Sequence, residues 1–257
     1  MPDESRLASV AGLYREWRPV GPLAGHLACT WMNALPESAV PPLQVIPDGC
    51  VDIIWTGQSL GVAGPDTEPI VESFAPGTVI VGVRFLPGAA PPWLGVPASE
   101  IVNGRVPLQE FWGADARRLA DRLHEIRDPR RAADQMLAAL VSRLPRPALF
   151  DPAARAVANA FTRDEHRRVR LSELTTTLGL SERTLRRRCE SAFGYGPKTL
   201  ARILRFQQFL GLLRRSAAPE LAELAAASGF ADQAHLTREV RRLGGLTPAN
   251  FMAQFAA

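Results

Sequence analysis

The sequence predicts an α+β fold with three parts: a β-rich N-terminal domain (a barrel or a cupin-like sandwich), two amphipathic linker helices, and an all-α C-terminal domain with two helix-turn-helix units. Eighteen of the 22 prolines precede residue 150. Because proline inside a helix costs about 3 kcal/mol, that part is not mainly helical. From residue 151 onward, apolar residues recur at helical spacing almost throughout. We expect domains at 1–112, 113–150 and 151–257.

Short apolar runs between turn residues predict the strands. Residues 43–46 and 50–55 flank a Pro-Asp-Gly turn, and residues 78–86 form a β-branched run that ends at Pro-Gly. Weaker candidates surround Val62, Ile70 and Phe74. These signals leave the order of the strands open.

The linker region has helical periodicity. Leu119, Leu123 and Ile126 share one face, and after an Asp-Pro step the pattern resumes up to Leu144. Two helices packed on the β-rich domain would explain this pattern. A dimer seam, or a relay between the domains, is the functional alternative.

Charge divides the chain into two unequal parts. Residues 1–150 hold 13 Arg against 16 Asp and Glu, whereas residues 151–257 hold 17 Lys and Arg against 10 Asp and Glu. A basic C-terminal part beside an acidic N-terminal part suggests that only the former meets a polyanion. An ordinary arginine-rich helical surface would have the same composition.

The first predicted helix-turn-helix unit contains residues 171–189. Ser172 is expected to cap its first helix, Gly179 to end that helix, and Ser181 to cap the second helix. Arg183, Arg186 and Arg187 recur at spacings of three and four, so they share a face. One face of a recognition helix packs on its supporting helix and the other enters the DNA major groove.

The second unit repeats the plan. A helix over 220–228 ends at Gly229, and Asp232 caps the next helix, on which Gln233, His235 and Arg238 are expected to face solvent. An amphipathic helix over 197–215 joins the two units. Such a pair of units places two recognition helices in successive major grooves, about 34 Å apart.

A resemblance supports this interpretation. Residues 221–251 read LAELAAASGFADQAHLTREVRRLGGLTPANF, which resembles the AraC/XylS family signature A-x3-G-F-x-[DS]-x-S-x-[FL]-x-R-x-F-[RK]-x3-G-x-[ST]-P. Ala234 and Val240 depart from it, where Ser and Phe are usual. The resemblance implies a sequence-specific, DNA-binding transcription regulator of bacteria. The base-reading residues that it implies are Arg183, Arg186, Arg187, Gln233, His235 and Arg238. Arginine pairs with guanine and glutamine with adenine, whereas a phosphate contact or a solvated charge is the alternative for each residue.

The N-terminal part resembles a β-rich domain that precedes this module in many regulators of high-GC bacteria. The matching stretches are residues 43–55 (LQVIPDGCVDIIW), 64–67 (GPDT), 82–89 (GVRFLPGA) and 94–100 (LGVPASE). Members of the AraC/XylS family commonly carry an N-terminal domain that binds an effector, dimerises, or both, so the resemblance of the C-terminal part implies one of these roles here.

Charged and aromatic residues in the predicted strands are candidates for effector binding. Asp52 and Arg84 lie in apolar surroundings, where a charge needs a partner or a polar ligand. An ion pair, or exposure on alternate strand positions, is the alternative. Trp31, Trp55 and Trp93, with Phe85, are candidates for an aromatic pocket or for core packing. Cys50 is a candidate redox sensor.

The remaining expectations concern chemistry and partners. No catalytic motif, metal-ligand spacing or cofactor loop occurs in the sequence, so we expect no enzyme, no metal and no cofactor. Three separated cysteines, together with the absence of a signal peptide and of a long apolar run, predict a cytoplasmic protein without a membrane association. The expected partners are double-stranded DNA, a small-molecule effector, RNA polymerase if the protein activates transcription, and a second copy in a homodimer. A regulator without a ligand, controlled by a protein partner, abundance or Cys50 oxidation, is the alternative.

Overall fold

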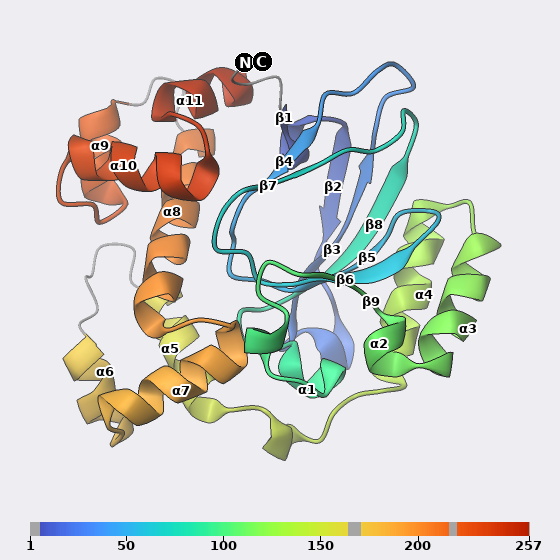
Figure 1. Ribbon diagram of the computed structural model, residues 1–257, viewed down its shortest axis with the longest axis horizontal. Helices are drawn as coiled ribbons and strands as arrows, with labels where there is room; N and C mark the ends of the chain where they lie inside the picture. The colour runs from blue at the N-terminus through green and yellow to red at the C-terminus, as the bar shows by residue number, and fades with distance from the viewer. Residues whose placement is uncertain (1–5, 164–170, 216–219, 257) are drawn as a thin grey trace.

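The computed structural model describes residues 6–163, 171–215 and 220–256. Two β-sheets and short helices form the N-terminal half, and helices form the C-terminal half (Figure 1). The α+β fold class predicted from the sequence is confirmed.

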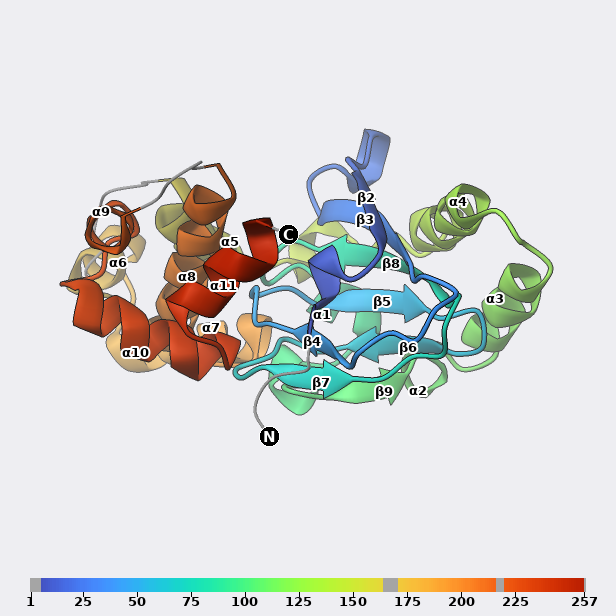
Figure 2. The ribbon, with the colours of Figure 1, turned by 90° about the horizontal axis from the view of Figure 1, so that it is seen from above.

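The N-terminal half contains a long sheet and a short sheet. The long sheet has the order β2-β3-β8-β5-β6-β9, and all its neighbouring strands are antiparallel. Its strands are β2 (Leu13–Trp17), β3 (Leu27–Ala34), β5 (Asp52–Trp55), β6 (Leu60–Ala63), β8 (Val79–Phe85) and β9 (Arg105–Pro107). The short sheet contains β1 (Arg6–Leu7), β4 (Leu43–Val45) and β7 (Ile70–Glu72), in which β1 pairs with β4 in parallel and β4 with β7 antiparallel. Figure 2 shows the two sheets from above. Since the described strands pair into two separate sheets, the arrangement is a sandwich rather than one closed barrel.

Alternation along each strand divides the long sheet into two faces. On β8, Val81, Val83 and Phe85 enter the larger hydrophobic core, whereas Ile80 and Arg84 point toward the short sheet. One face of the sheet is therefore mainly apolar, and the other carries charged groups into the space between the sheets.

Two helices cover the apolar face. These are α3 (Ala114–His124) and α4 (Pro129–Val141), and α4 contacts both β8 and β3. The side chain of Asp128 caps α4 by accepting the backbone N–H of Arg130. Two single-turn helices, α1 (Pro91–Leu94) and α2 (Gln109–Trp112), were not predicted. The packing interpretation of the linker helices is thus confirmed, and the dimer seam stays a prediction.

The C-terminal half is organised around one long central helix, α8 (Pro197–Arg215). Around it lie α5 (Pro152–Arg163), α6 (Leu171–Leu178), α7 (Glu182–Phe193), α9 (Leu221–Ala227), α10 (Gln233–Gly244) and α11 (Pro248–Ala256). Ile203, Phe206 and Leu210 of α8 have no exposed surface. Leu7 of β1 also packs into this helical core, so the two halves share a boundary across the N-terminal strand.

Two local expectations were wrong. Ser172 is the second residue of α6 rather than its cap, because the helix already begins at Leu171. The position before Leu171 lies outside the described residues. Phe74 lies beyond the end of β7 and packs against the cluster between the sheets without being part of a strand.

Candidate functional site

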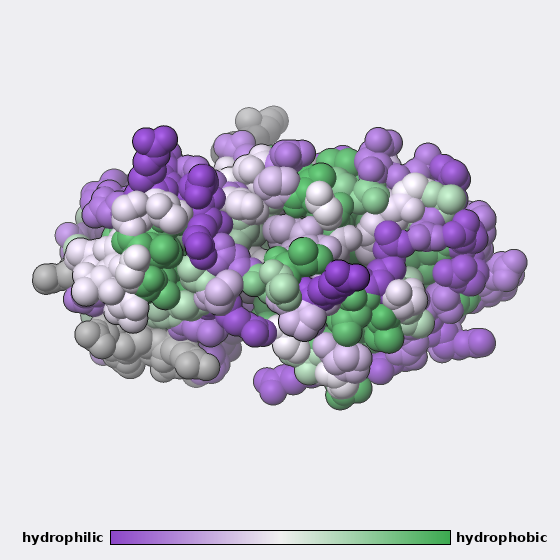
Figure 3. Space-filling view, turned by 90° about the horizontal axis from the view of Figure 1, so that it is seen from below, coloured by the Kyte–Doolittle hydropathy of each residue, from purple (hydrophilic) through white to green (hydrophobic). Residues whose placement is uncertain are grey.

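Helix α7 presents a charged face to solvent. Its N-terminus is capped by Ser181, whose hydroxyl accepts the backbone N–H of Thr184 at 3.2 Å. Leu185 and Cys189 point inward, whereas Arg183, Arg186 and Arg187 are exposed. Hydrophilic side chains project from the helical half in the space-filling view (Figure 3).

The free face of α7 already contains one ion pair. The Arg186 side chain is 74% exposed, and its Nε donates to Glu190 Oε1 at 2.7 Å. An exposed i,i+4 pair contributes only about 0.3–0.5 kcal/mol, so Arg186 is readily released to another acceptor.

Helix α10 presents a mixed polar face. Asp232 caps it by accepting the backbone N–H of His235 at 2.6 Å, and Gln233 and Arg238 are exposed. His235 is half-buried, and its Nδ1 accepts the backbone N–H of Ala231 at 3.3 Å. In the neutral ring the proton then lies on Nε2, which makes Nε2 a hydrogen-bond donor.

Helix α8 holds α10 in place. Arg202 of α8 donates to both carboxylate oxygens of Glu239, at 2.6 and 3.0 Å. The guanidinium of Arg205 lies 5.6 Å from the centre of the Phe230 ring, next to the turn before α10. Bidentate and stacked arginines restrict orientation, so α8 holds both α10 and the turn that precedes it.

A cavity of about 440 Å³ lies between the two sheets. This volume is in the range of small-molecule sites. Leu43, Ile54, Phe74 and Ile80 form part of its apolar wall.

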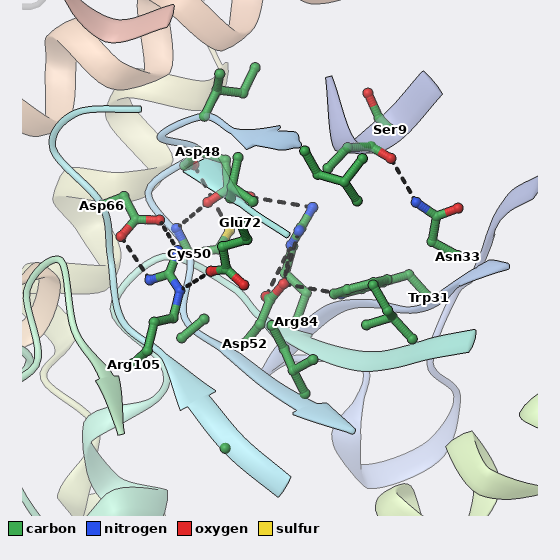
Figure 4. Close-up of a pocket in the computed structure, with 18 of the residues that line it drawn as sticks. Ser9, Trp31, Asn33, Asp48, Cys50, Asp52, Asp66, Glu72, Arg84 and Arg105 are labelled. Atoms are coloured by element: carbon green, nitrogen blue, oxygen red, sulfur yellow. Dashed lines mark hydrogen bonds and ion pairs between the residues drawn. The ribbon is translucent and has the colours of Figure 1, made fainter. Parts of the chain in front are cut away.

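The first charged cluster in the cavity surrounds Arg84. Its Nε and Nη2 donate to Asp52 at 3.0 and 2.9 Å, and its Nη1 lies 3.3 Å from Asp48. Trp31 Nε1 donates to Asp52 Oδ2 at 3.1 Å. Burial raises the pKa of Asp52, and the adjacent Arg84 guanidinium opposes this shift by stabilising the carboxylate. The predicted Asp52–Arg84 ion pair therefore forms, and it forms inside a cavity (Figure 4).

The indole of Trp31 is positioned by a glycine. A Cβ placed on Gly82, the neighbour of Trp31 across β3 and β8, would lie 2.2 Å from Trp31 Cε2. Since no side chain fits there, the ring lies flat over the strand and its N–H reaches Asp52.

A second charged cluster surrounds Arg105. Its Nη1 and Nη2 donate to the two carboxylate oxygens of Asp66 at 3.0 and 2.9 Å, and its Nε donates to Glu72 at 2.6 Å. Burial raises the pKa of Asp66, and the hydrogen bonds from Arg105 oppose this shift.

Cys50 lines the cavity but is not activated. Its backbone N–H donates to Asp48 Oδ1 at 2.9 Å. Burial first, and then the negative charge of Asp48, raise the pKa of the Cys50 thiol well above its usual value. A reactive cysteine needs the opposite shift.

The predicted effector residues divide into two groups. Trp31, Asp52 and Arg84 line the cavity together, and so does the redox candidate Cys50. Trp55 and Trp93 do not line it: both are 4% exposed and belong to the core under α3 and α4. Asp48 was expected only as a turn residue, and Asp66, Glu72 and Arg105 were not predicted as site residues.

The cavity wall also contacts the helical half. Gln207 of α8 lines the cavity, and its Nε2 donates to the carbonyl of Pro47 at 2.6 Å. Arg214 of α8 lines it as well. Gln44 of β4, another lining residue, donates from Nε2 to the carbonyl of Gly244 at 2.7 Å, at the end of α10.

The end of α7 is packed against the N-terminal half. Gly194 has φ +86°, and a Cβ there would lie 2.4 Å from Val102 Cγ2 and 3.1 Å from Pro65 Cγ. Helices α7 and α10 therefore both end against segments next to the cavity.

Within the part of the chain that the structure describes, no group of three or more His, Cys, Asp or Glu side chains is suited to holding a metal ion. None of the described helices combines the length and the hydrophobicity needed to span a bilayer.

The solved structures similar to this chain include transcription regulators. The C-terminal domain of AraT, a response regulator from Geobacillus stearothermophilus, is 18% identical over 40% of this chain and 85% of that chain, with a TM-score of 0.38. A probable AraC family transcriptional regulator from Rhodopseudomonas palustris is 25% identical over 41% of this chain and 98% of that chain, with a TM-score of 0.38. ToxT from Vibrio cholerae is 12% identical over 89% of this chain and 98% of that chain, with a TM-score of 0.47. No curated protein matches the sequence.

Two family models match the sequence. Residues 174–254 match a helix-turn-helix domain, and residues 15–107 match a domain of unknown function, DUF6597. The first range contains α7, α8 and α10, and the second contains most of the cavity wall. The chain thus combines an N-terminal region that matches DUF6597 with a C-terminal region that matches a helix-turn-helix domain, and the second match supports a DNA-binding role.

Proposed function

We propose that the protein binds a specific DNA sequence through α7 and α10 and that a small molecule in the cavity between the sheets modulates this binding. The observation that carries the DNA part is the pair of capped, exposed recognition helices attached to one rigid helix, α8. The observation that carries the effector part is a cavity whose wall includes residues of α8.

The chemistry of the two helices suits the major groove. Arg183, Arg186 and Arg187 offer donors to guanine O6 and N7, which suggests a guanine-containing half-site for α7. On α10, Gln233 pairs with adenine in two hydrogen bonds, and His235 offers its Nε2 proton to an acceptor. The domain ranges 1–112, 113–150 and 151–257 belong to the same proposal, with the last range as the DNA-binding part.

Selection of binding sites from random DNA by the full chain tests the DNA part. On the selected site, Arg186→Ala or Arg238→Ala is expected to cost about 1–3 kcal/mol of binding free energy. Arg117→Ala, an exposed arginine on α3, is the matched control and is expected to change nothing. If a recognition-helix variant loses the same affinity on random DNA as on the selected site, that arginine contacts phosphate and does not read a base.

The contacts between the halves supply a path from ligand to DNA. Gln44 lines the cavity and contacts the end of α10. Pro47 and Pro65 adjoin lining residues; Pro47 contacts α8, and Pro65 contacts the end of α7. A ligand that shifts these segments changes the support of both recognition helices. Coupling of this kind needs a difference in ligand affinity between the two arrangements, and the cavity is where that difference arises.

The alternatives without a ligand receive less support. A cavity of this size between the sheets favours a ligand-binding domain, and a thiol whose pKa is raised by burial argues against control through Cys50. The homodimer and the contact with RNA polymerase stay predictions. Sedimentation equilibrium of the full chain gives its mass in solution and so tests the homodimer. The proposed role is binding rather than catalysis.

A further inference from the structure

The charges that line the cavity do not balance. Each of its two clusters holds one arginine between two carboxylates: Asp48–Arg84–Asp52 and Asp66–Arg105–Glu72. Each cluster therefore has one negative charge in excess when all groups are ionised.

The remaining charged lining residues do not correct this excess. Glu16 and Arg214 both line the cavity and offset each other. Burial lowers the pKa of Arg214, and the neighbouring Tyr14 and Glu16 oppose that shift. In total the lining holds five carboxylates and three arginines.

The two clusters lie close enough to repel each other. Asp48 of the first cluster contributes, after burial, to the raised pKa of Asp66 in the second. Figure 4 shows both clusters in the same part of the cavity, with Glu72 on the side of Arg105 that faces Arg84. The negative excess is therefore concentrated in one region.

This excess is sheltered from solvent. The side chains of Asp52 and Asp66 are 9% and 7% exposed, and those of Asp48 and Glu72 are 28% and 29% exposed. Salt screens partly buried charges less than surface charges, so the cavity attracts positive charge even at physiological ionic strength. A buried charge in excess is costly unless a partner of opposite sign is supplied.

We propose that the cavity binds an organic cation: an ammonium or guanidinium group that sits between the two acidic clusters, attached to an apolar body that packs on Leu43, Ile54 and Phe74. This inference rests on the proposed effector function and names the chemical class of the effector. An organic cation fits better than a metal ion for two reasons. Among the described residues, no three His, Cys, Asp or Glu side chains are placed to hold a metal ion together, and much of the cavity wall is apolar.

A matched series of three probes tests the charge of the ligand. Phenylbutylamine, phenylbutanol and phenylbutyrate share one apolar body and differ in the terminal group: cationic, neutral and anionic at neutral pH. Isothermal titration calorimetry of the full chain with each probe measures the preference. We expect the amine to bind about tenfold more tightly than the alcohol, the ratio of one charge-assisted hydrogen bond, and the carboxylate to bind most weakly.

Variants that remove the excess charge provide the second readout. Glu72→Gln and Asp48→Asn each neutralise one cluster at a partly exposed position, and each arginine keeps its other carboxylate. Each variant is expected to weaken the amine about tenfold and to leave the alcohol unchanged. Asp121→Asn, an exposed carboxylate on α3 that does not line the cavity, is expected to change neither affinity.

Three results would overturn the inference, and each differs from failure of the proposed function. If phenylbutyrate binds most tightly, or if the alcohol equals the amine, the cavity binds ligands but the assignment of charge is wrong. If none of the probes binds, the cation assignment fails, whereas the DNA selection tests the regulator function independently.

Discussion

Replacing Gly194 by alanine probes the contact between α7 and the N-terminal half. Gly194 adopts φ +86° and ψ −13° at the end of α7, a conformation that costs an L-residue about 1–2 kcal/mol. The new Cβ would also lie 2.4 Å from Val102 Cγ2 and 3.1 Å from the carbonyl oxygen of Ala98. Overpacking of this kind destabilises a fold by about 1–3 kcal/mol more. The expected loss in the free energy of unfolding is therefore about 2–5 kcal/mol.

Gly95 provides the matched control. It adopts φ +76° and ψ 10° at the end of α1, and no atom lies within 4 Å of a Cβ built on it. Gly95→Ala is therefore expected to lower the free energy of unfolding only through the strained backbone, by about 1–2 kcal/mol. Urea denaturation of the full-length variants measures both losses. Equal losses for the two variants would refute the close packing of α7 on residues 98–102, and with it one arm of the proposed coupling.

Two further outcomes follow from the cavity. Gly82→Ala places a Cβ 2.2 Å from Trp31 Cε2, so we expect the free energy of unfolding to fall by about 1–3 kcal/mol. The near-ultraviolet circular dichroism spectrum should also change, because the indole has to move. An unchanged spectrum would mean that the indole does not lie over the strand or donate to Asp52. Because burial raises the pKa of the Cys50 thiol, its thiolate forms only at more alkaline pH. Iodoacetamide is therefore expected to alkylate Cys50 more slowly in the folded chain than in urea, and the rate should rise with pH. Alkylation as fast as that of a free thiol would restore the redox alternative.

The helical half was largely predictable because its signals are local. A capping side chain, a glycine with positive φ and the spacing of apolar residues define each helix within a few positions, and Ser181, Gly179, Gly229 and Asp232 act as expected. The error at Ser172 has the same origin, since a cap signal determines a helix start only to within one or two residues.

The charged clusters were only partly predictable because they depend on strand register. Asp52 and Arg84 attracted attention since each carries a charge within an apolar strand, and they are direct partners across β5 and β8. Arg105 reaches Asp66 and Glu72 only through the pairing of β9 with β6 and of β7 with β4, which no local pattern specifies. By contrast, the sequence alone could have excluded Trp55 from the site of Asp52. Trp55 follows Asp52 by three residues on one strand, so its side chain points to the opposite face.

The position of the cavity determines how a ligand would act on DNA binding. Its wall reaches α8 directly through Gln207 and the end of α10 through Gln44, and the adjoining Pro65 packs against the end of α7. A cation between the acidic clusters would relieve the repulsion between Asp48 and Asp66, and these residues follow Pro47 and Pro65 in the chain. The same residues that would bind the ligand therefore adjoin the segments that contact α8 and α7. Because coupling between two sites is reciprocal, any effect of the ligand on DNA affinity requires an equal effect of DNA on ligand affinity. The contacts of Gln44, Pro47 and Pro65 with the helices are among those that could transmit both effects.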